Sequence, residues 1–362
     1  MKVVFIRTKL DSTVFMEGAG TNRELDAAAL ERMKITQKAG SSSKNTIFGL
    51  KAYNIISEYE EWKFWSGRLQ EVAVPGQMPV RLFPCDESFA LKELAHYIRA
   101  EGQPDILWVE GPDYPLYIER IFQLCPNSFK LVYSKDWRPW KIANLVAYDL
   151  CLVDEDWEVA KVKSRCPEIH CEVWDKLIDY ESMFYPIQCE KLYDICCVAY
   201  LRARKNHELL LRAMGRINER RLSCLCVGDD RKNYRVELER LIAELNLSVH
   251  FTGEVPYEEV NRHINSARIG VLPAKLDAAP RAILEYMAAD IPVLVNSELL
   301  AGARYVGEGA GLVKSPAEFH LGIREVLDNY SNYSPRAFFM EHYSSEKVIP
   351  KFIGILEKSG GL

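Results

Sequence analysis

The sequence predicts an α/β protein made of two doubly wound parallel sheets, one in each half of the chain. Its 362 residues are too many for one ordinary domain and suit two. Hydrophobic residues make up 48% of the chain and charged residues 27%, the balance of a globular protein with ample core. Short apolar runs alternate with helical patterns through both halves, which is typical of parallel sheets covered by helices.

In the first half, apolar runs predict strands at 3–7, 80–84, 106–109, 130–134, 150–153 and 169–173, with helices at 87–100, 115–124 and 156–164. All seven tryptophans lie in this half: Trp62, Trp65, Trp108, Trp137, Trp140, Trp157 and Trp174. Aromatic rings commonly pack in a core, and they also line ligand clefts. Core packing and stacking against a sugar acceptor therefore both stay open.

In the second half, strands are expected at 194–199, 223–227, 249–252, 269–272, 292–295 and 311–314, with helices at 207–218, 234–245, 257–266 and 282–289. A final helix is expected at 344–358. We expect an N-terminal domain at 1–185, a C-terminal domain at 186–343, and a segment 344–362 that packs back toward the N-terminal domain. Doubly wound sheets bind ligands at the carboxyl ends of their strands.

The charge balance argues against nucleic acid as a partner. The formal net charge is −5, so neither nucleic acid nor an anionic membrane surface is favoured, and peripheral membrane contact has no support from charge. The N-terminus lacks a signal-peptide core, which predicts a cytoplasmic protein. The ten cysteines lie mostly in apolar runs, which favours buried free thiols. Cys166, His170 and Cys171 lack the paired spacing of zinc sites, so no metal is expected.

The stretch LDAAPRAILEYMAADIPVLV contains the strongest candidate site. Asp277 precedes a helix that Pro280 begins, and Glu285 lies about one turn into it. The amides of Arg281, Ala282 and Ile283 are then expected to face an anion, reinforced by the helix dipole. Carboxylates beside a diphosphate would suit the hydroxyls of a sugar nucleotide.

Further motifs follow in order: CCVAYLRARKNHELLLRAM, then CLCVGDD, then VHFTGEVPYEEV, then the two-acid stretch. From Asp194 to Leu362 the chain resembles the donor-binding domain of the retaining GT-B glycosyltransferases, the large family that includes bacterial mannosyltransferases and sucrose synthases. The first half matches only in outline. The resemblance implies two Rossmann-like domains facing across a cleft, with a hinge near 179–186 whose closure excludes water.

The resemblance also implies roles for individual residues. Lys205 matches the diphosphate-binding lysine, Asp277 the acid that contacts the transferred sugar, and Glu285 the acid that holds the ribose; these three are the catalytic candidates. The remaining donor-side candidates are Arg202, Arg204, Gly228, Asp229, Gly253, Glu254, Val255, Pro280, Arg281 and Ala282, with Gly18 and Gly20 in the first half. The acceptor-side candidates are Lys135, Asp136, Trp137 and Glu110.

Several positions depart from the family pattern. Ala199 and Tyr200 replace the usual glycine and arginine, so we expect Arg202, Arg204 or Arg281 to supply the missing guanidinium. Asp277 is one methylene shorter than the usual glutamate, alanines replace glycines before Pro280, and Lys135 replaces a histidine.

The expected reaction is transfer of a hexose from a nucleoside-diphosphate sugar, with UDP or GDP as its nucleotide, to an acceptor hydroxyl with retention, in polysaccharide biosynthesis or a related process. Neither a tightly bound cofactor nor a metal is required, because cationic side chains stabilise the leaving diphosphate. A non-catalytic nucleotide- or glycan-binding protein, an epimerase and a phosphorylase remain as alternatives. The oligomeric state stays open.

Overall fold

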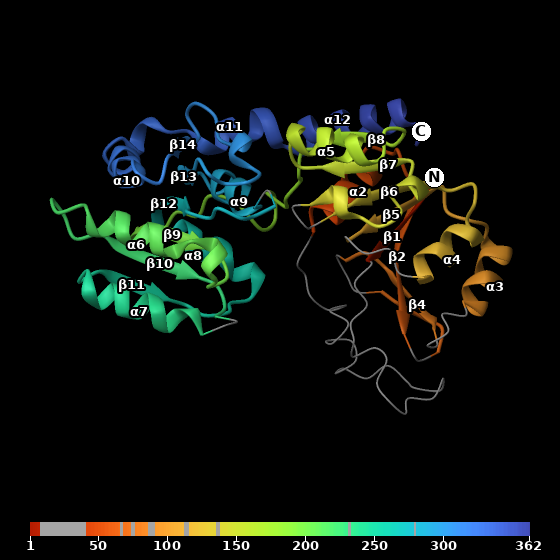
Figure 1. The fold of residues 1–362 in the computed structure, drawn as a ribbon, viewed down its shortest axis with the longest axis horizontal. Coiled ribbons are helices and arrows are strands. Elements are labelled where there is room, and N and C mark those ends of the chain that lie inside the picture. Colours follow the sequence, from red (N-terminus) through yellow and green to blue (C-terminus); the bar gives the residue numbers. More distant parts are fainter. Residues whose placement is uncertain are drawn as a thin grey trace. The chain divides into compact units, whose positions relative to one another are not determined.

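The computed structural model describes residues 1–7, 41–65, 68–73, 77–85, 91–111, 116–134, 138–230, 233–278 and 280–362. The chain forms two compact units. One comprises Met1–Asp175 with Ile349–Leu362, and the other comprises Lys176–Val348 (Figure 1). Each unit contains a sheet of mainly parallel strands with helices, which confirms the predicted fold class.

The sheet of the first unit has the strand order β3-β4-β2-β1-β5-β6-β7-β8. The strands are β1 (Lys2–Arg7), β2 (Glu58–Trp65), β3 (Gln70–Val72), β4 (Val80–Pro84), β5 (Ile106–Glu110), β6 (Phe129–Tyr133), β7 (Leu150–Val153) and β8 (His170–Val173). Among the described strands of this sheet, β3 alone runs antiparallel to its neighbour. The sequence prediction missed β2 and the short strand β3. The four acidic or basic side chains among the eight residues of β2 hide the apolar pattern of a buried strand.

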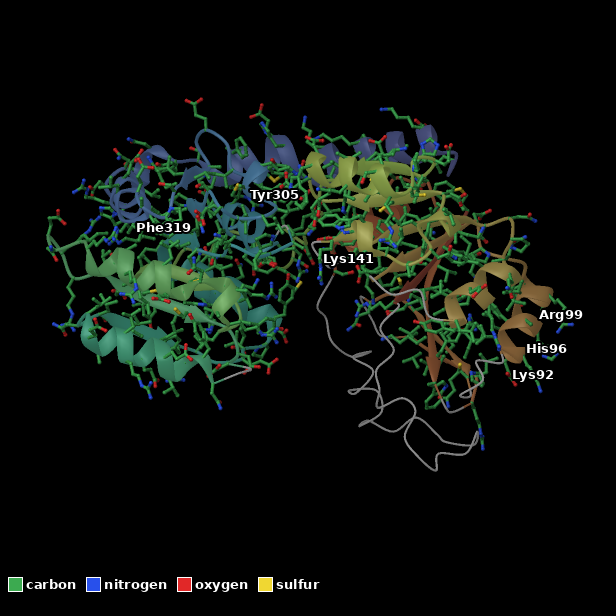
Figure 2. The ribbon with its side chains drawn as sticks, viewed as in Figure 1. Lys92, His96, Arg99, Lys141, Tyr305 and Phe319 are labelled. Carbon is green, nitrogen blue, oxygen red and sulfur yellow. The ribbon has the colours of Figure 1, made fainter. Side chains whose placement is uncertain are left out.

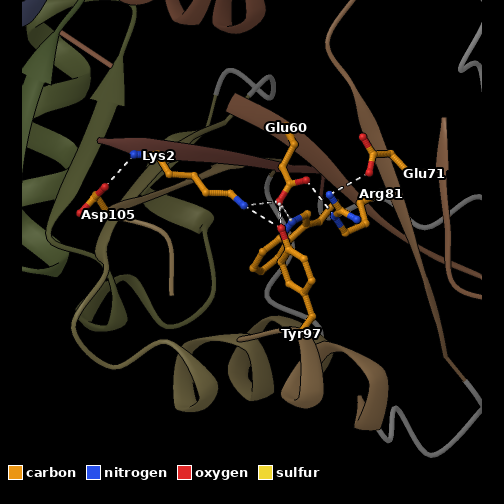
Figure 3. A network of polar contacts seen from close by, with 7 residues as sticks. Lys2, Glu60, Glu71, Arg81, Tyr97 and Asp105 are labelled. Atoms are coloured by element: carbon orange, nitrogen blue, oxygen red, sulfur yellow. Dashed lines mark hydrogen bonds and ion pairs between the residues drawn. The ribbon is translucent and has the colours of Figure 1, made fainter. Parts of the chain in front are cut away.

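Charged partners explain how β2 buries its acids. Successive side chains of a strand point to opposite faces, so Glu60 and Glu61 face different layers. The Glu60 carboxylate accepts from Tyr97 at 3.0 Å and from Arg81 at 2.9 Å, and it pairs with Lys2 at 2.9 Å (Figure 3). Burial opposes ionisation of Glu60, but Lys2, the Trp62 hydrogen bond and Arg81 outweigh it and lower the pKa of Glu60 below its usual value.

The helices of the first unit are α2 (Ser42–Ala52), α3 (Lys92–Glu101), α4 (Leu116–Leu124) and α5 (Asp156–Arg165). Helix α3 buries Leu94, and its exposed side carries Lys92, His96 and Arg99 at helical spacing (Figure 2). The last helix is α12 (Ser345–Ser359), and the segment from Ile349 to Leu362 groups with the first unit.

Most of the described tryptophans belong to the core. Trp62, Trp65, Trp108 and Trp174 are buried. The Phe352 ring of α12 stacks on Trp108 with ring centres 5.3 Å apart and lies 5.9 Å from Trp174. For these four residues the packing interpretation is correct, because their rings are enclosed by other side chains and cannot stack on an acceptor. Trp137 lies outside the described residues.

The second unit has an all-parallel sheet in the order β11-β10-β9-β12-β13-β14. Its strands are β9 (Tyr193–Val198), β10 (Ser223–Val227), β11 (Ser248–Phe251), β12 (Ala267–Leu272), β13 (Val293–Asn296) and β14 (Gly311–Lys314). Its helices are α6 (His207–Gly215), α7 (Tyr234–Glu244), α8 (Val260–Asn265), α9 (Ala282–Ala288), α10 (Phe319–Asp328) and α11 (Pro335–Tyr343). Tyr305 and Phe319 are fully buried within this unit (Figure 2).

The strand order places the first strand of this unit, β9, beside both β10 and β12. The chain therefore reverses its direction of winding between β9 and β12, and such a switch point is where open α/β sheets bind ligands. The segments that follow β9 and β12 carry the basic loop and the two-acid stretch. The topology thus brings two stretches together that are about seventy residues apart in the sequence.

The cysteines are free thiols, as the sequence predicted. Nine are buried and Cys189 is exposed. Cys166 and Cys171 are buried whereas His170 is exposed, so these three side chains do not converge. Among the described residues, no helix is both long enough and apolar enough to cross a membrane.

Candidate functional site

The basic loop begins where β9 ends and is held by backbone contacts to the next strand. Leu201 forms an isolated parallel bridge with Asp230, and its amide donates to the Asp229 carbonyl at 2.9 Å. A 3₁₀ turn, η3 (Ala203–Lys205), follows. Asn206 then adopts a left-handed conformation with φ of 57°, and its side chain donates to the Pro273 carbonyl at 3.2 Å. The loop is therefore tied to the segment that follows β12.

Lys205 and Asp277 meet directly in this site. The Lys205 ammonium donates to the Asp277 carboxylate, and the Arg204 Nη1 lies 3.6 Å from the other carboxylate oxygen. The Lys205 and Asp277 side chains are only 11% and 13% exposed, whereas Arg204 is 40% exposed. Arg204 also donates to the Leu276 carbonyl at 3.0 Å. Two cations thus converge on one carboxylate across the switch point.

Glu285 lies on α9 and is 4% exposed. Its carboxylate accepts from the Tyr257 hydroxyl at 2.7 Å and lies 3.9 Å from the Arg281 Nε. Burial raises the pKa of Glu285 above its usual value, while Arg281 and the Tyr257 hydrogen bond oppose that rise. The Arg281 guanidinium also lies 5.2 Å from the centre of the Tyr257 ring. The carboxylate is therefore buried and fixed in orientation by two side chains.

The start of α9 differs in one respect from the sequence prediction. The helix begins at Ala282, and the Ile283 amide donates to the Pro280 carbonyl at 3.3 Å. The expectation that the Ile283 amide faces an anion is therefore wrong for this conformation, because the first turn already uses it. The preceding loop is held by Lys176, a buried lysine whose ammonium donates to the Ala278 carbonyl at 3.1 Å.

Two glycines shape the backbone beside the basic loop. Gly228 has φ of 149°, and a Cβ there would lie 2.3 Å from the Ala199 carbonyl oxygen, so only glycine fits. Its amide donates to the carbonyl of Gly253, which has φ of 73°. Gly228 therefore permits close approach of neighbouring backbones, and both glycines meet at the edge where β10 and β11 end. Glu254 is exposed just beyond this point, followed by Val255.

His207 is a buried neighbour of Lys205 that the sequence prediction did not include. It is 1% exposed, and within the described ranges neither ring nitrogen has a hydrogen-bond partner. Burial and the adjacent Lys205 charge lower the pKa of His207 to about 4, so the ring is neutral at physiological pH. A neutral imidazole does not repel the positively charged Lys205 ammonium.

The first unit has its own polar cluster where β1 and β5 end. The Glu110 carboxylate accepts from Ser43 at 2.6 Å and lies 3.5 Å from the Arg7 Nε. Glu61 pairs with Lys44 at 2.5 Å and with Lys63 at 3.6 Å. Burial opposes ionisation of Glu61, but Lys63, Lys44 and Arg7 outweigh it and lower its pKa to about 2.

The structure shows which candidate arginine lies beside Lys205, and some other candidates fall outside the described residues. Arg204 is the candidate arginine that joins Lys205, whereas Arg281 turns to Glu285 and the Arg202 guanidinium lies 5.9 Å from the Tyr200 ring. Gly18, Gly20, Lys135, Asp136 and Trp137 lie outside the described residues. Tyr257 was missed although it lies in the quoted VHFTGEVPYEEV motif, because its role depends on reaching an acid 28 positions away.

The family comparison covers the unit that contains this site. Residues 186–337 match the family model "Glycosyl transferases group 1". The chain is also 28% identical over 116 residues to a GDP-Man:Man(3)GlcNAc(2)-PP-Dol alpha-1,2-mannosyltransferase of Xenopus laevis. That match covers 29% of this chain and 24% of the relative, so the chain spans about a quarter of the length of that protein.

Solved structures resemble the whole chain in fold. Sucrose-phosphate synthase from Thermosynechococcus elongatus matches with a TM-score of 0.67 at 14% identity, covering 99% of this chain and 98% of that one. HepE from Anabaena, solved with UDP, matches with a TM-score of 0.67 at 12% identity, covering 99% and 100%. The fold is therefore GT-B, and the family match lies in the unit that contains Lys205, Asp277 and Glu285.

Proposed function

We propose that this protein transfers a hexose from a nucleoside-diphosphate sugar to an acceptor hydroxyl, with retention at the anomeric carbon and without a metal. The observation that carries the proposal is the convergence of Lys205 and Arg204 on Asp277 at the switch point of the second sheet. A site that already holds a carboxylate between two cations has the charge needed to hold a diphosphate.

Each acid then has a distinct role in the proposal. Glu285, oriented by Tyr257 and Arg281, accepts hydrogen bonds from the ribose hydroxyls. Lys205 and Arg204 bind the diphosphate and stabilise the charge that develops on it as the glycosidic bond breaks. Asp277, displaced from Lys205 by the incoming phosphate, accepts hydrogen bonds from the transferred sugar. The backbone of Gly253, Glu254 and Val255 is the proposed place of the base.

UDP and GDP are the proposed nucleotides. HepE was solved with UDP, and the Xenopus laevis relative is a GDP-mannose enzyme by its name. On the acceptor side, Glu110 is proposed as a candidate at the carboxyl end of β5, although its buried carboxylate already accepts from Ser43. Lys135, Asp136 and Trp137 remain acceptor-side candidates on the sequence alone. The acceptor is proposed to be a glycan, a lipid-linked sugar or a small molecule, handled in the cytoplasm.

The test is a transfer assay with UDP- and GDP-hexoses, each with simple sugar acceptors and with a chelator present. We expect one donor to release its nucleoside diphosphate only when acceptor is present, and proton NMR to show an α-linked product from an α-linked donor. Lys205→Ala should abolish release, whereas Lys275→Ala should not, because Lys275 forms an exposed pair with Glu298.

Three results would count against the proposal. Donor conversion without acceptor would indicate an epimerase or a hydrolase. A requirement for inorganic phosphate would indicate a phosphorylase. Nucleotide binding without any turnover would indicate a non-catalytic protein. That second candidate is favoured by the direct pairing of Lys205 with Asp277, which engages the lysine that would hold the diphosphate.

A further inference from the structure

Tyr286 occupies an unusual place between two strands of the second sheet. It lies on α9, directly after Glu285, and is fully buried. Its hydroxyl accepts from the Val198 amide at 2.7 Å and donates to the Cys196 carbonyl at 3.1 Å. Both partners are backbone groups of β9. A helix side chain thus makes two bonds that a neighbouring strand makes in a regular sheet.

The register of the sheet shows which bonds the hydroxyl replaces. The ladder between β12 and β9 ends at the pair Gly270↔Cys196, although both strands continue beyond it. On its other side, β12 stays paired with β13 as far as Leu272. The Cys196 carbonyl and the Val198 amide face the same side of β9, where the next rung to β12 would form. The Tyr286 hydroxyl takes the place of that rung.

Gly270 makes room for this arrangement. A Cβ at Gly270 would lie 2.4 Å from Cγ of the Tyr286 ring, closer than any carbon contact allows. The tyrosine ring therefore lies directly against the β12 backbone. Gly270 is therefore required by Tyr286, because a side chain at position 270 would displace the tyrosine ring. Its hydroxyl would then no longer bond to the Cys196 carbonyl and the Val198 amide of β9.

The consequence falls on the donor site. Val198 is the last residue of β9, and the loop that carries Lys205 starts immediately after it. Glu285 precedes Tyr286 on α9. One hydroxyl therefore links the base of the Lys205 loop to the helix that carries the ribose candidate.

We propose that Tyr286 is a positioning residue: its hydroxyl holds β9 and β12 apart and sets the separation between Lys205 and Glu285, so that the two ends of a nucleoside diphosphate fit at once. This inference rests on the proposed donor site. Without the hydroxyl, the Cys196 carbonyl and the Val198 amide lose their partners, and buried backbone groups without partners move or admit water.

The test compares Tyr286→Phe with Tyr343→Phe, which also removes the hydroxyl of a buried tyrosine; that of Tyr343 donates to the Arg304 carbonyl at 3.4 Å. Calorimetry measures binding of UDP and uridine, and of GDP and guanosine, well below the unfolding temperature. We expect Tyr286→Phe to weaken diphosphate binding about tenfold, the loss of one charge-assisted contact, and nucleoside binding less than about twofold.

Equal weakening of nucleoside and nucleoside diphosphate, or no weakening, would overturn the proposal and leave Tyr286 a merely structural residue. Tyr343→Phe should leave both affinities unchanged.

Hydrogen exchange on the ligand-free protein provides a second test that needs no nucleotide. The amides of Leu201 and Lys205 donate to backbone carbonyls within or beside the basic loop, at 2.9 and 2.8 Å. We expect Tyr286→Phe, and not Tyr343→Phe, to speed exchange at these two amides at least about tenfold. Unchanged exchange would overturn the positioning role. If the wild-type protein bound no nucleotide, the proposed function would fail, and the exchange result would still decide whether Tyr286 positions the loop.

Discussion

Asp277→Asn should tighten the binding of a free nucleoside diphosphate, although it alters a proposed catalytic residue. The Asp277 carboxylate contacts Lys205 and Arg204, at the position that the proposed diphosphate would take. Asparagine keeps the shape and removes the competing negative charge. A role for Asp277 in holding the nucleotide itself would give the opposite result.

The magnitude follows from the burial of the pair. Two unit charges about 4 Å apart attract by about 4 kcal/mol at an effective dielectric constant of about 20, and exposed pairs contribute less than about 1 kcal/mol. The Lys205 and Asp277 side chains are 11% and 13% exposed, so their coupling lies between these limits. Because the phosphate oxygens replace the carboxylate, we expect a net gain of about 1.4 kcal/mol, or a tenfold lower Kd.

Titration calorimetry with UDP and GDP measures this change. Glu298→Gln is the matched control, because it removes an acid paired with a lysine at 2.9 Å where both side chains are about half exposed or more. Its Kd should stay within about twofold of the wild type. Asp277→Asn should also lower transfer activity, since a neutral amide oxygen accepts hydrogen bonds from the sugar hydroxyls more weakly than a carboxylate does. An unchanged or weaker affinity for the free diphosphate in Asp277→Asn would refute the displacement of Asp277 by phosphate.

Three further predictions test other parts of the structure. Tyr257→Phe removes a hydrogen bond that opposes the rise in the pKa of Glu285, so that pKa should rise further. Because nucleotide binding needs the ionised carboxylate, affinity should be lost at a higher pH than in the wild type as the solution is acidified; an identical pH profile of Kd would contradict this. Glu61→Gln removes a carboxyl whose pKa is lowered from 4.5 to about 2. In the wild type, ionised Glu61 should therefore contribute roughly 3 kcal/mol to the free energy of unfolding above pH 4.5, and this contribution should be lost as the pH falls toward 2. Urea unfolding should show a smaller loss of unfolding free energy between pH 4.5 and 2 in Glu61→Gln than in the wild type. The same loss should be unchanged in Glu71→Gln, whose side chain is 56% exposed. Gly270→Ala should cost about 3 kcal/mol through its clash with Tyr286, whereas Gly354→Ala, with no atom within 4 Å of the added carbon, should be neutral or stabilising; equal effects would contradict the packing of Tyr286 on β12.

The alternating pattern was sufficient to predict most of the fold. Every strand of the second unit was predicted within a residue or two. The central strands β10, β12 and β13 are almost entirely buried and read as continuous apolar runs. Strand β2 escaped because its buried acids Glu60 and Glu61 are compensated by ion pairs. Apart from Lys63 of the same strand, the partners Lys2, Arg81 and Lys44 are distant from these acids in the sequence.

The residues of the candidate site could be predicted where a sequence motif directly follows a strand, because the carboxyl ends of parallel strands meet at one edge of a sheet. Lys205 and Asp277 were selected as separate motif residues, and their direct pairing could not be foreseen because it requires the register of β9 and β12. Tyr286 gave no signal, since its role exists only where the ladder with Gly270 ends. The individual roles of Lys205, Asp277 and Glu285 stay predictions.

The most direct test of the donor site is thermal unfolding of the wild-type protein, Lys205→Ala and the exposed-site control Lys275→Ala against UDP and GDP in large excess. A nucleotide at about a hundred times its Kd should add roughly 2.7 kcal/mol to the free energy of unfolding. We predict that one nucleotide raises the Tm of the wild type and of Lys275→Ala by several degrees and leaves Lys205→Ala unchanged. An equal rise in Lys205→Ala, or no rise in the wild type with either nucleotide, would contradict a donor site built on Lys205.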